Sequence, residues 1–243
     1  MRVAKILFLT SVFVCTHNIA LADSQDSKFF GQAGIGGVYY DFLGENISSF
    51  GAYLGGEFGW EFFNRVHTTF GVRLGGGQSK ASQVLGVAES AGFVISDQYV
   101  KVGINIAGVN APLYVNLLTE QNNHNSKSGL SRNLSLLGAE IEGALPLGNV
   151  AKLEYSVGYA FSTGDSSYSI AEKTSYIKKD PSQSYVLSAS VGFVRNLSDS
   201  ISFYTKLIGK YQNLNGAYYS DGTQGYPSSS NIVGMLEFGF RGL

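Results

Sequence analysis

The sequence has 243 residues and is rich in Gly (31), Tyr (15) and Phe (16), with only 4 Pro and 14% charged residues. Its mean hydropathy of +0.05 is too low for a bundle of membrane-spanning helices. The near balance of 17 basic and 18 acidic residues gives no reason to expect nucleic-acid binding.

Residues 1–22 have the layout of a secretory signal peptide. Arg2 and Lys5 form a positive start, residues 6–14 form an apolar core, and Ala20-Leu21-Ala22 is a small-x-small cleavage site. The apolar run is too short to span a bilayer. We therefore expect a cleaved signal, with an uncleaved anchor as the alternative.

Residues 23–243 are expected to form one mature domain. Cys15 is the only cysteine and lies inside the signal. The mature chain would then have no thiol for a disulfide, a metal site or nucleophilic catalysis. The sequence predicts no cofactor and no metal.

The clearest pattern in the mature chain is a pair of alternating segments between residues 50 and 78. Because side chains alternate faces along a strand, this predicts two long strands with a tight turn at Asn64-Arg65-Val66. Glu57 is then expected opposite Arg73. The apolar face of the hairpin comprises Phe50, Ala52, Leu54, Gly56, Phe58, Trp60, Phe62, Thr68, Phe70, Val72 and Leu74. An aromatic face backed by a charged face is typical of a membrane barrel, whose apolar side faces lipid.

Alternation recurs along the chain and predicts ten strands. The alternating segments lie at 29–42, 50–62, 68–74, 100–106, 113–117, 137–145, 153–161, 185–193, 201–209 and 232–240. The long connections are 41–49, 79–98, 120–131, 163–184 and 213–230, and the short ones are 64–66, 108–112, 146–149 and 196–199. Outer-membrane barrels have short periplasmic turns, longer external loops and an even strand count. We predict an all-β, transmembrane antiparallel up-and-down β-barrel of ten strands, a count that depends on dividing 99–118 into two strands. An eight-stranded barrel is the alternative.

Charged side chains on the polar faces of these strands are balanced in sign. They are Glu57, Glu61, Arg73, Lys101, Glu140, Glu142, Lys152, Glu154, Lys206, Lys210, Glu237 and Arg241. Charges in a narrow lumen have to be paired, because burying an unpaired charge is costly. We expect a salt-bridged network that closes the lumen, with a narrow selective pore as the alternative. Glu140 and Glu142 resemble an acid/base pair, but no nucleophile adjoins them in the sequence.

His124-Asn125-Ser126 is the strongest enzymatic signal. Some outer-membrane lipases carry a His-x-Ser pair, and a serine needs an adjacent base to become nucleophilic. Here the triplet lies in a polar stretch expected to be an external loop. The sequence therefore favours a solvated loop histidine over a catalytic one.

Aromatic residues divide into two sets. One set lies near the short turns or the end of the chain: Phe58, Trp60, Phe62, Phe193, Phe203, Phe238 and Phe240. The other lies near the long loops: Phe50, Tyr159, Phe161, Tyr185 and Tyr211. Two girdles at the two lipid interfaces would produce this division.

Three features carry a resemblance to a known class of proteins: the signal, the repeated hairpins and the last strand. The last strand reads Ile232-Val233-Gly234-Met235-Leu236-Glu237-Phe238-Gly239-Phe240-Arg241-Gly242-Leu243. The chain resembles small outer-membrane β-barrel proteins of Gram-negative bacteria, of the opacity and Helicobacter types. The resemblance covers residues 29–243 and carries no catalytic residues. It implies a monomer in contact with outer-membrane lipid and lipopolysaccharide, inserted by the barrel-assembly machinery. Such chains usually end in an aromatic residue, whereas this sequence ends in Leu243.

The function expected from this reading is surface interaction through external loops, without catalysis, with an unknown host or surface ligand. Loops are where binding residues gather on a rigid scaffold. The candidate contact residues are Lys173, Lys178, Lys179, Tyr218, Tyr219 and Tyr226. A narrow porin is the first alternative, and a membrane-embedded lipid hydrolase is the second.

Overall fold

The computed structural model describes residues 27–43, 47–81, 90–108, 110–127, 129–170, 173–177 and 184–242. The signal peptide predicted for 1–22 lies outside these ranges. Within them, the structure holds no helix of the length and apolarity needed to cross a membrane.

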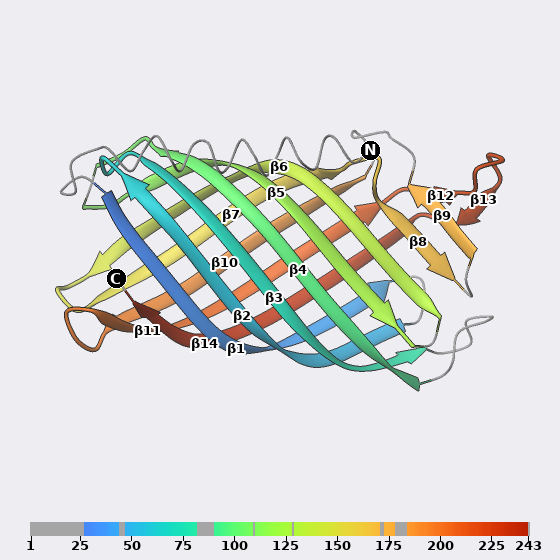
Figure 1. The fold of residues 1–243 in the computed structure, drawn as a ribbon, viewed down its shortest axis with the longest axis horizontal. Coiled ribbons are helices and arrows are strands. Elements are labelled where there is room, and N and C mark those ends of the chain that lie inside the picture. Colours follow the sequence, from blue (N-terminus) through green and yellow to red (C-terminus); the bar gives the residue numbers. More distant parts are fainter. Residues whose placement is uncertain are drawn as a thin grey trace.

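Ten long antiparallel strands close into a barrel (Figure 1). They are β1 (Ser27–Leu43), β2 (Ile47–Phe62), β3 (Val66–Ala81), β4 (Ser90–Asn105), β5 (Leu113–Ser126), β6 (Leu130–Leu147), β7 (Ala151–Ser162), β10 (Tyr185–Asn196), β11 (Ile201–Leu214) and β14 (Ser229–Gly242). Each pairs with the next of the ten, and β14 pairs with β1, from Gly31 opposite Gly242 to Leu43 opposite Ser230. The predicted fold class is confirmed, with ten strands rather than eight, and 99–118 is divided between β4 and β5 as expected.

The alternation of each strand assigns its two faces as predicted. On β2, Leu54 is 67% exposed on the outer surface, whereas its neighbour Tyr53 is 3% exposed in the lumen. On β1, Ile35 and Val38 show the same contrast, at 64% and 1%. Apolar side chains cover the outside of this closed sheet, which is the reverse of a soluble barrel and is the arrangement that contact with lipid requires.

The β2–β3 turn corrects one predicted contact. The Arg65 N–H donates to the Phe62 carbonyl oxygen at 2.9 Å, and Phe63 and Asn64 have positive φ angles of 55° and 52°. This tight turn closes one residue earlier than expected, so Phe62 pairs with Val66. Glu57 therefore lies opposite Gly71, and the expected pairing of Glu57 with Arg73 is wrong.

Several segments predicted as loops are strand. β3 and β4 extend into 79–98, and β5 and β6 extend into 120–131. In these extensions most outward-facing side chains are polar, as Gln121 and Asn125 are, and the side chains between them are buried. Strands of 16 to 18 residues exceed the roughly 9–11 that span a bilayer, so this end of the barrel stands above the membrane. Outward polarity made these segments look like loops in the sequence.

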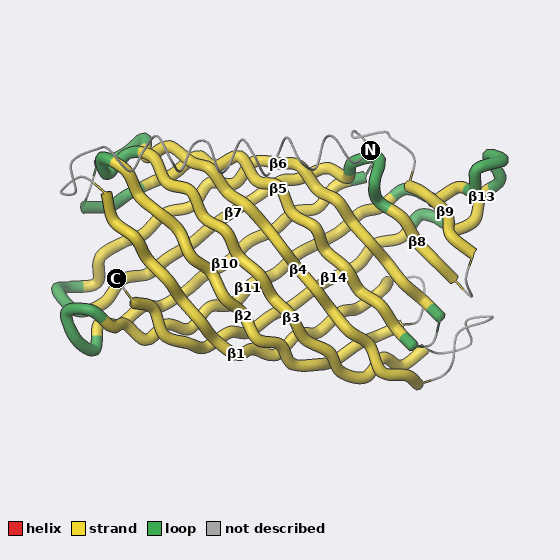
Figure 2. The backbone as a smooth tube through the Cα atoms, viewed as in Figure 1, coloured by secondary structure: helices red, strands yellow, loops and turns green. Residues whose placement is uncertain are grey.

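Two more of the predicted long loops, 163–184 and 213–230, also contain strands. β8 (Ser167–Ile170), β9 (Lys173–Ile177), β12 (Ala217–Tyr218) and β13 (Gln224–Tyr226) form a small sheet that continues from β6 in the order β6-β8-β9-β12-β13. We call these four strands the outer sheet. It projects beyond the barrel at the right-hand end of Figure 1, opposite the short turns at the left-hand end of Figure 2.

Candidate functional site

The outer half of the lumen is filled by an apolar core. Its side chains come from most strands of the barrel and from the outer sheet: Val38, Tyr40, Phe42, Ile47, Phe93, Ile95, Leu130, Leu134, Leu136, Tyr168, Ile177, Val186, Leu214, Ala217, Tyr226, Val233 and Met235. Leu130, Leu134 and Leu214 are at most 1% exposed. The charge network expected for the lumen does not extend over this half as an apolar-free lining, because these apolar side chains pack there. Above the membrane the barrel is surrounded by water and packs inward like a soluble domain.

The inner half of the lumen contains the predicted charges, all on inward-facing strand positions. Its most buried pair is Arg73 with Glu237, where Nε lies 3.1 Å from Oε2. Glu237 also accepts hydrogen bonds from the hydroxyls of Tyr53 (3.0 Å) and Tyr204 (2.7 Å). These three hydrogen-bond donors stabilise the charge of the Glu237 carboxylate, which little water reaches.

Two further clusters lie in the same half. The Lys101 ammonium pairs with Glu140 at 3.0 Å and also with Glu142. The two carboxylates proposed as an acid/base pair therefore share one cation, which is the arrangement of a structural ion pair. Closer to the turns, Arg241 binds Glu154 through both Nη atoms, at 2.6 and 2.9 Å, and Lys152 reaches Glu154 at 2.8 Å.

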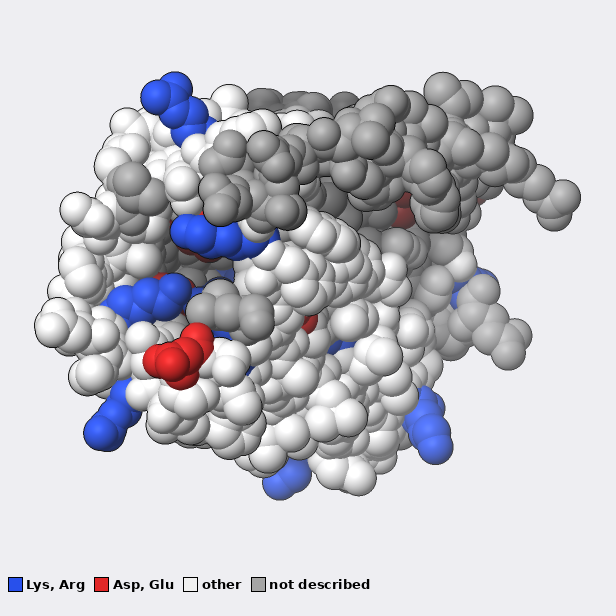
Figure 3. Space-filling view, turned by 60° about the vertical axis from the view of Figure 1, so that its left-hand side comes forward, with Lys and Arg blue, Asp and Glu red and all other residues white. Residues whose placement is uncertain are grey.

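The other predicted acids have neutral donors. Glu57 accepts from the Tyr99 hydroxyl, and Glu61 accepts from the Tyr114 hydroxyl at 2.8 Å. Figure 3 shows Lys, Arg, Asp and Glu side chains around the end of the barrel that carries the short turns.

Sequence reasoning missed three lumen charges, Asp97, Glu120 and Arg132, because they lie in or directly next to segments expected to be loops. Glu120 pairs with Lys210, and Asp97 accepts from the Asn122 amide at 2.6 Å. The guanidinium of Arg132, 1% exposed, lies over the rings of Tyr40 and Phe42 at 5.9 and 5.1 Å. The only sequence signal for them was weak alternation with polar neighbours.

Lys206 is the exception within the network. It forms no ion pair within the described part of the chain. In the β11–β14 register it lies opposite Glu237, but the oxygens of Glu237 already bind Arg73, Tyr53 and Tyr204. Its ammonium group is therefore left beside a small cavity.

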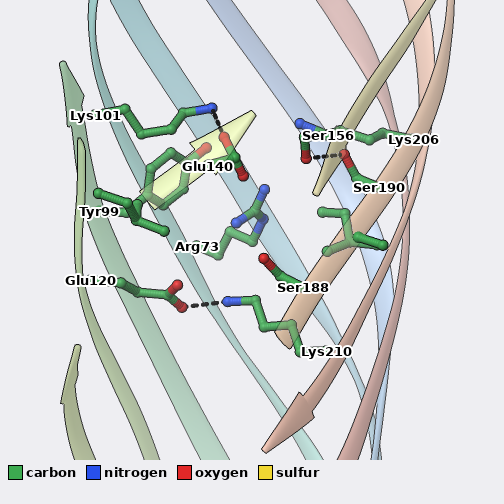
Figure 4. Close-up of a pocket in the computed structure, with 13 residues that line it drawn as sticks. Arg73, Tyr99, Lys101, Glu120, Glu140, Ser156, Ser188, Ser190, Lys206 and Lys210 are labelled. Carbon is green, nitrogen blue, oxygen red and sulfur yellow. Dashed lines mark hydrogen bonds and ion pairs between the residues drawn. The ribbon is translucent and has the colours of Figure 1, made fainter. Parts of the chain in front are cut away.

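This cavity has a volume of about 50 Å³ and lies between the two halves of the lumen. Its polar lining consists of Arg73, Tyr99, Lys101, Glu120, Glu140, Ser156, Ser188, Ser190, Lys206 and Lys210. Figure 4 shows these side chains pointing toward a common space from strands on opposite sides of the barrel. Cations on the wall outnumber carboxylates by four to two.

His124 and Ser126 lie on β5 with both side chains facing inward, so the predicted solvated loop is wrong. His124 is 0% exposed and stacks on Phe93, with ring centroids 4.8 Å apart and planes 15° apart. The rings of Tyr40 and Phe42 contact the imidazole edge-on, with ring centroids 5.1 and 5.2 Å from its centroid. No hydrogen-bond partner within the described residues reaches either ring nitrogen. The enclosure leaves no path for a lipid ester and gives the imidazole no orienting carboxylate.

We therefore expect that replacing His124 with Met leaves the free energy of unfolding unchanged or raises it. The substitution removes two buried nitrogens without partners and keeps an apolar side chain of similar size. Urea titration of the folded barrel in lipid vesicles would measure the effect. A large loss of stability would show that the imidazole holds a partner through water.

The aromatic residues near the turns lie on the outer surface. Trp60 contacts Phe29 at 5.2 Å and Phe58 at 5.6 Å, and Phe203 lies 5.9 Å from Phe240. Phe193 is 37%, Phe238 44% and Phe240 58% exposed, while Phe62 is half-buried. Their place at a lipid interface remains a prediction.

The candidate contact residues fall in different environments. Lys173 is exposed on β9, Tyr218 is half-buried on β12 between β9 and β13, and Tyr219, which follows β12, is also half-buried. Tyr226 is only 5% exposed and stacks on Tyr168, with centroids 4.4 Å apart. Its expected exposure is wrong, because the inner face of the outer sheet packs on the core. Lys178 and Lys179 lie outside the described residues.

A closed ring of antiparallel strands, apolar outside and charged within, defines a transmembrane β-barrel of the Gram-negative outer-membrane type. The outer membrane is therefore the location of the protein. The apolar outer surface is contributed by every strand of the barrel, including Phe29, Ile35, Phe50, Leu54, Leu74, Val94, Val102, Ile104, Val115, Leu117, Ile141, Val157, Val191, Leu207, Leu236 and Phe238.

The sequence matches no protein-family model and no curated protein. Among solved structures, the chain is similar to the outer membrane protease OmpT from Escherichia coli, with a TM-score of 0.58 and 10% identity over 91% of this chain and 98% of that one. It is also matched with the transport unit of the autotransporter AIDA-I from Escherichia coli (TM-score 0.47, 10% identity, 92% of each chain). A third match is OprG from Pseudomonas aeruginosa (TM-score 0.43, 12% identity, 89% and 95%). At such identities, the likeness to OmpT shows the fold alone.

Proposed function

We propose that this protein is a non-enzymatic surface protein that binds a partner through the outward face of its outer sheet. The observation that carries the proposal is a row of side chains across the sheet. In register, Ser167 on β8 faces Tyr176 on β9, which faces Tyr218 on β12, which faces Gln224 on β13. Tyr176 is 54% exposed, and Lys173 lies on the same strand.

Two adjacent tyrosines are suited to binding because each supplies a large rigid contact area at low entropy cost. The face is also held in place from below. Tyr168 and Tyr226 stack beneath the sheet, and the Tyr168 hydroxyl lies 3.0 Å from the Ser229 hydroxyl. At the sheet tip, Thr223 donates two hydrogen bonds to Asp221, which lowers the pKa of that carboxyl. An ordered surface loses less entropy when it binds than a flexible loop would.

The lumen favours this proposal over a narrow porin. A pore needs a continuous open path, whereas the outer half of this lumen is filled by packed side chains, many of them aliphatic or aromatic. The proposal is also favoured over a lipid hydrolase, because His124 is enclosed by three aromatic rings.

The test uses cells that display the protein and otherwise adhere weakly. Adhesion to one another, to epithelial cells and to matrix-coated plates is measured for the wild type and for the double variant Tyr176→Ser with Tyr218→Ser. We expect the wild type to adhere and the double variant to lose most of this adhesion. Heat-modifiable migration on a gel would verify that the variant barrel is folded.

Tyr159→Ser is the matched control. Tyr159 is 46% exposed, comparable with Tyr176, but it lies on the barrel wall beside Tyr185. We expect this control to adhere like the wild type. Adhesion no greater than that of cells without the protein, or equal adhesion by the double variant, would refute the proposal.

A further inference from the structure

Two of the cations around the lumen cavity have donors that the network does not use. Arg73 is 7% exposed, and its Nε donates to Glu237. A guanidinium has five N–H donors in a planar fork, and within the described residues the bond from Nε to Glu237 is the one side-chain hydrogen bond that Arg73 donates. The guanidinium also lies 5.2 Å from the centroid of the Tyr99 ring. Figure 4 shows the fork of Arg73 pointing into the space between Glu140 and Ser188.

Lys206 provides a second unused donor on the opposite wall. Lys206 lines the cavity and has no ion pair within the described residues, although its charge also acts on Glu140. Ser156 and Ser190, whose hydroxyls lie 2.8 Å apart, and Ser188 line the same wall. A planar fork, an ammonium and several hydroxyls around one space are the donors that bind oxyanions.

The charge balance on the cavity wall favours an anion. Four cations line it, but only two carboxylates, Glu120 and Glu140, do so. The carboxylates that complete the pairs, Glu142 and Glu237, are not part of the lining. In the lining itself cations outnumber carboxylates by two, and Glu142 and Glu237 pair with Lys101 and Arg73 from behind it.

The volume limits the size of the ligand. A buried water takes on the order of 10–15 Å³ by the same measure. The cavity, at about 50 Å³, holds a few waters or one small oxyanion, and it excludes sugars and nucleotides.

From these four observations we propose that the lumen binds a small oxyanion, a phosphate or a carboxylate, between Arg73 and Lys206. The bound anion completes the hydrogen bonds of the Arg73 fork and neutralises Lys206.

The test is isothermal titration calorimetry of the folded barrel in detergent with inorganic phosphate and, separately, sodium acetate, at constant ionic strength. We expect saturable one-site binding of at least one of the two anions. Binding of phosphate alone would identify a tetrahedral oxyanion site, and binding of acetate alone would identify a carboxylate site. The absence of saturable binding for both would overturn the proposal.

Three variants locate the site. Lys206→Gln should weaken binding by about tenfold or more, because a hydrogen bond between charged groups is lost. Ser188→Val fills the space without changing charge, so it should abolish binding even if Lys206→Gln fails to fold. Lys152→Gln makes the same change of charge on a side chain that is 40% exposed and away from the cavity, and it should bind like the wild type. Wild-type affinity in both Lys206→Gln and Ser188→Val would place the anion elsewhere and overturn the proposal.

Discussion

Replacing Glu237 with Ala is expected to lower the free energy of unfolding by about 3–5 kcal/mol, the usual cost of breaking a buried ion pair from one side. Glu237 is 2% exposed and accepts hydrogen bonds from Arg73, Tyr53 and Tyr204. Its removal leaves the Arg73 charge and two hydroxyls without their acceptor in a confined space. Urea titration in lipid vesicles, followed by the fluorescence of the single tryptophan, Trp60, would measure the loss.

Lys152→Ala is the control for this variant. Lys152 also belongs to a lumen ion pair, but its side chain is 40% exposed, and Glu154 keeps Arg241 as a partner. We expect a loss of less than about 1 kcal/mol, as for solvent-exposed pairs. Equal losses in the two variants would mean that the lumen is wet throughout and that burial does not control the energies of its charges.

The second large effect concerns the lipid-facing wall. Leu54 is 67% exposed on the outer face of β2, among other apolar side chains such as Ile35 and Leu74. Replacing Leu54 with Arg places a charge in hydrocarbon and should cost about 2–4 kcal/mol near the bilayer midplane. The same urea titration in vesicles would report this cost.

Gln121→Arg is the matched control on the outer surface. Gln121 also faces outward, but it lies on the extension of β5 that stands above the apolar band. Substitutions of this kind in water usually change stability by less than about 0.5 kcal/mol. A cost for Gln121→Arg as large as that for Leu54→Arg would show that the membrane covers the extension as well.

The sequence was a good guide to the barrel because each strand in the membrane has contrasting faces. Phe58 and Glu57, or Val157 and Ser156, can be assigned to lipid and lumen by alternation alone. It was a poor guide to strand ends. Above the membrane the outward side chains turn polar, as at Asn123 and Asn125, and this pattern resembles that of a loop.

The candidate site was predictable only in part. Alternation assigned Arg73, Glu237 and Lys206 to the lumen, but no local pattern reveals which charges meet across a closed barrel. Arg73 and Glu237 are 164 residues apart in the chain. The outer sheet was harder still, because strands as short as β12 carry too few residues to show a period. Tyr176 was therefore missed, although it is the more exposed tyrosine of the contact row.

Planar-bilayer recording tests most directly whether the barrel is closed, as expected for a protein that acts at its outer end. The apolar core and the paired charges predict that the purified wild-type protein, once inserted, gives no stable single-channel steps. Stable steps whose conductance changes when Arg73 or Lys206 is replaced with Gln would contradict a closed barrel, because they would show that ions pass along the lumen.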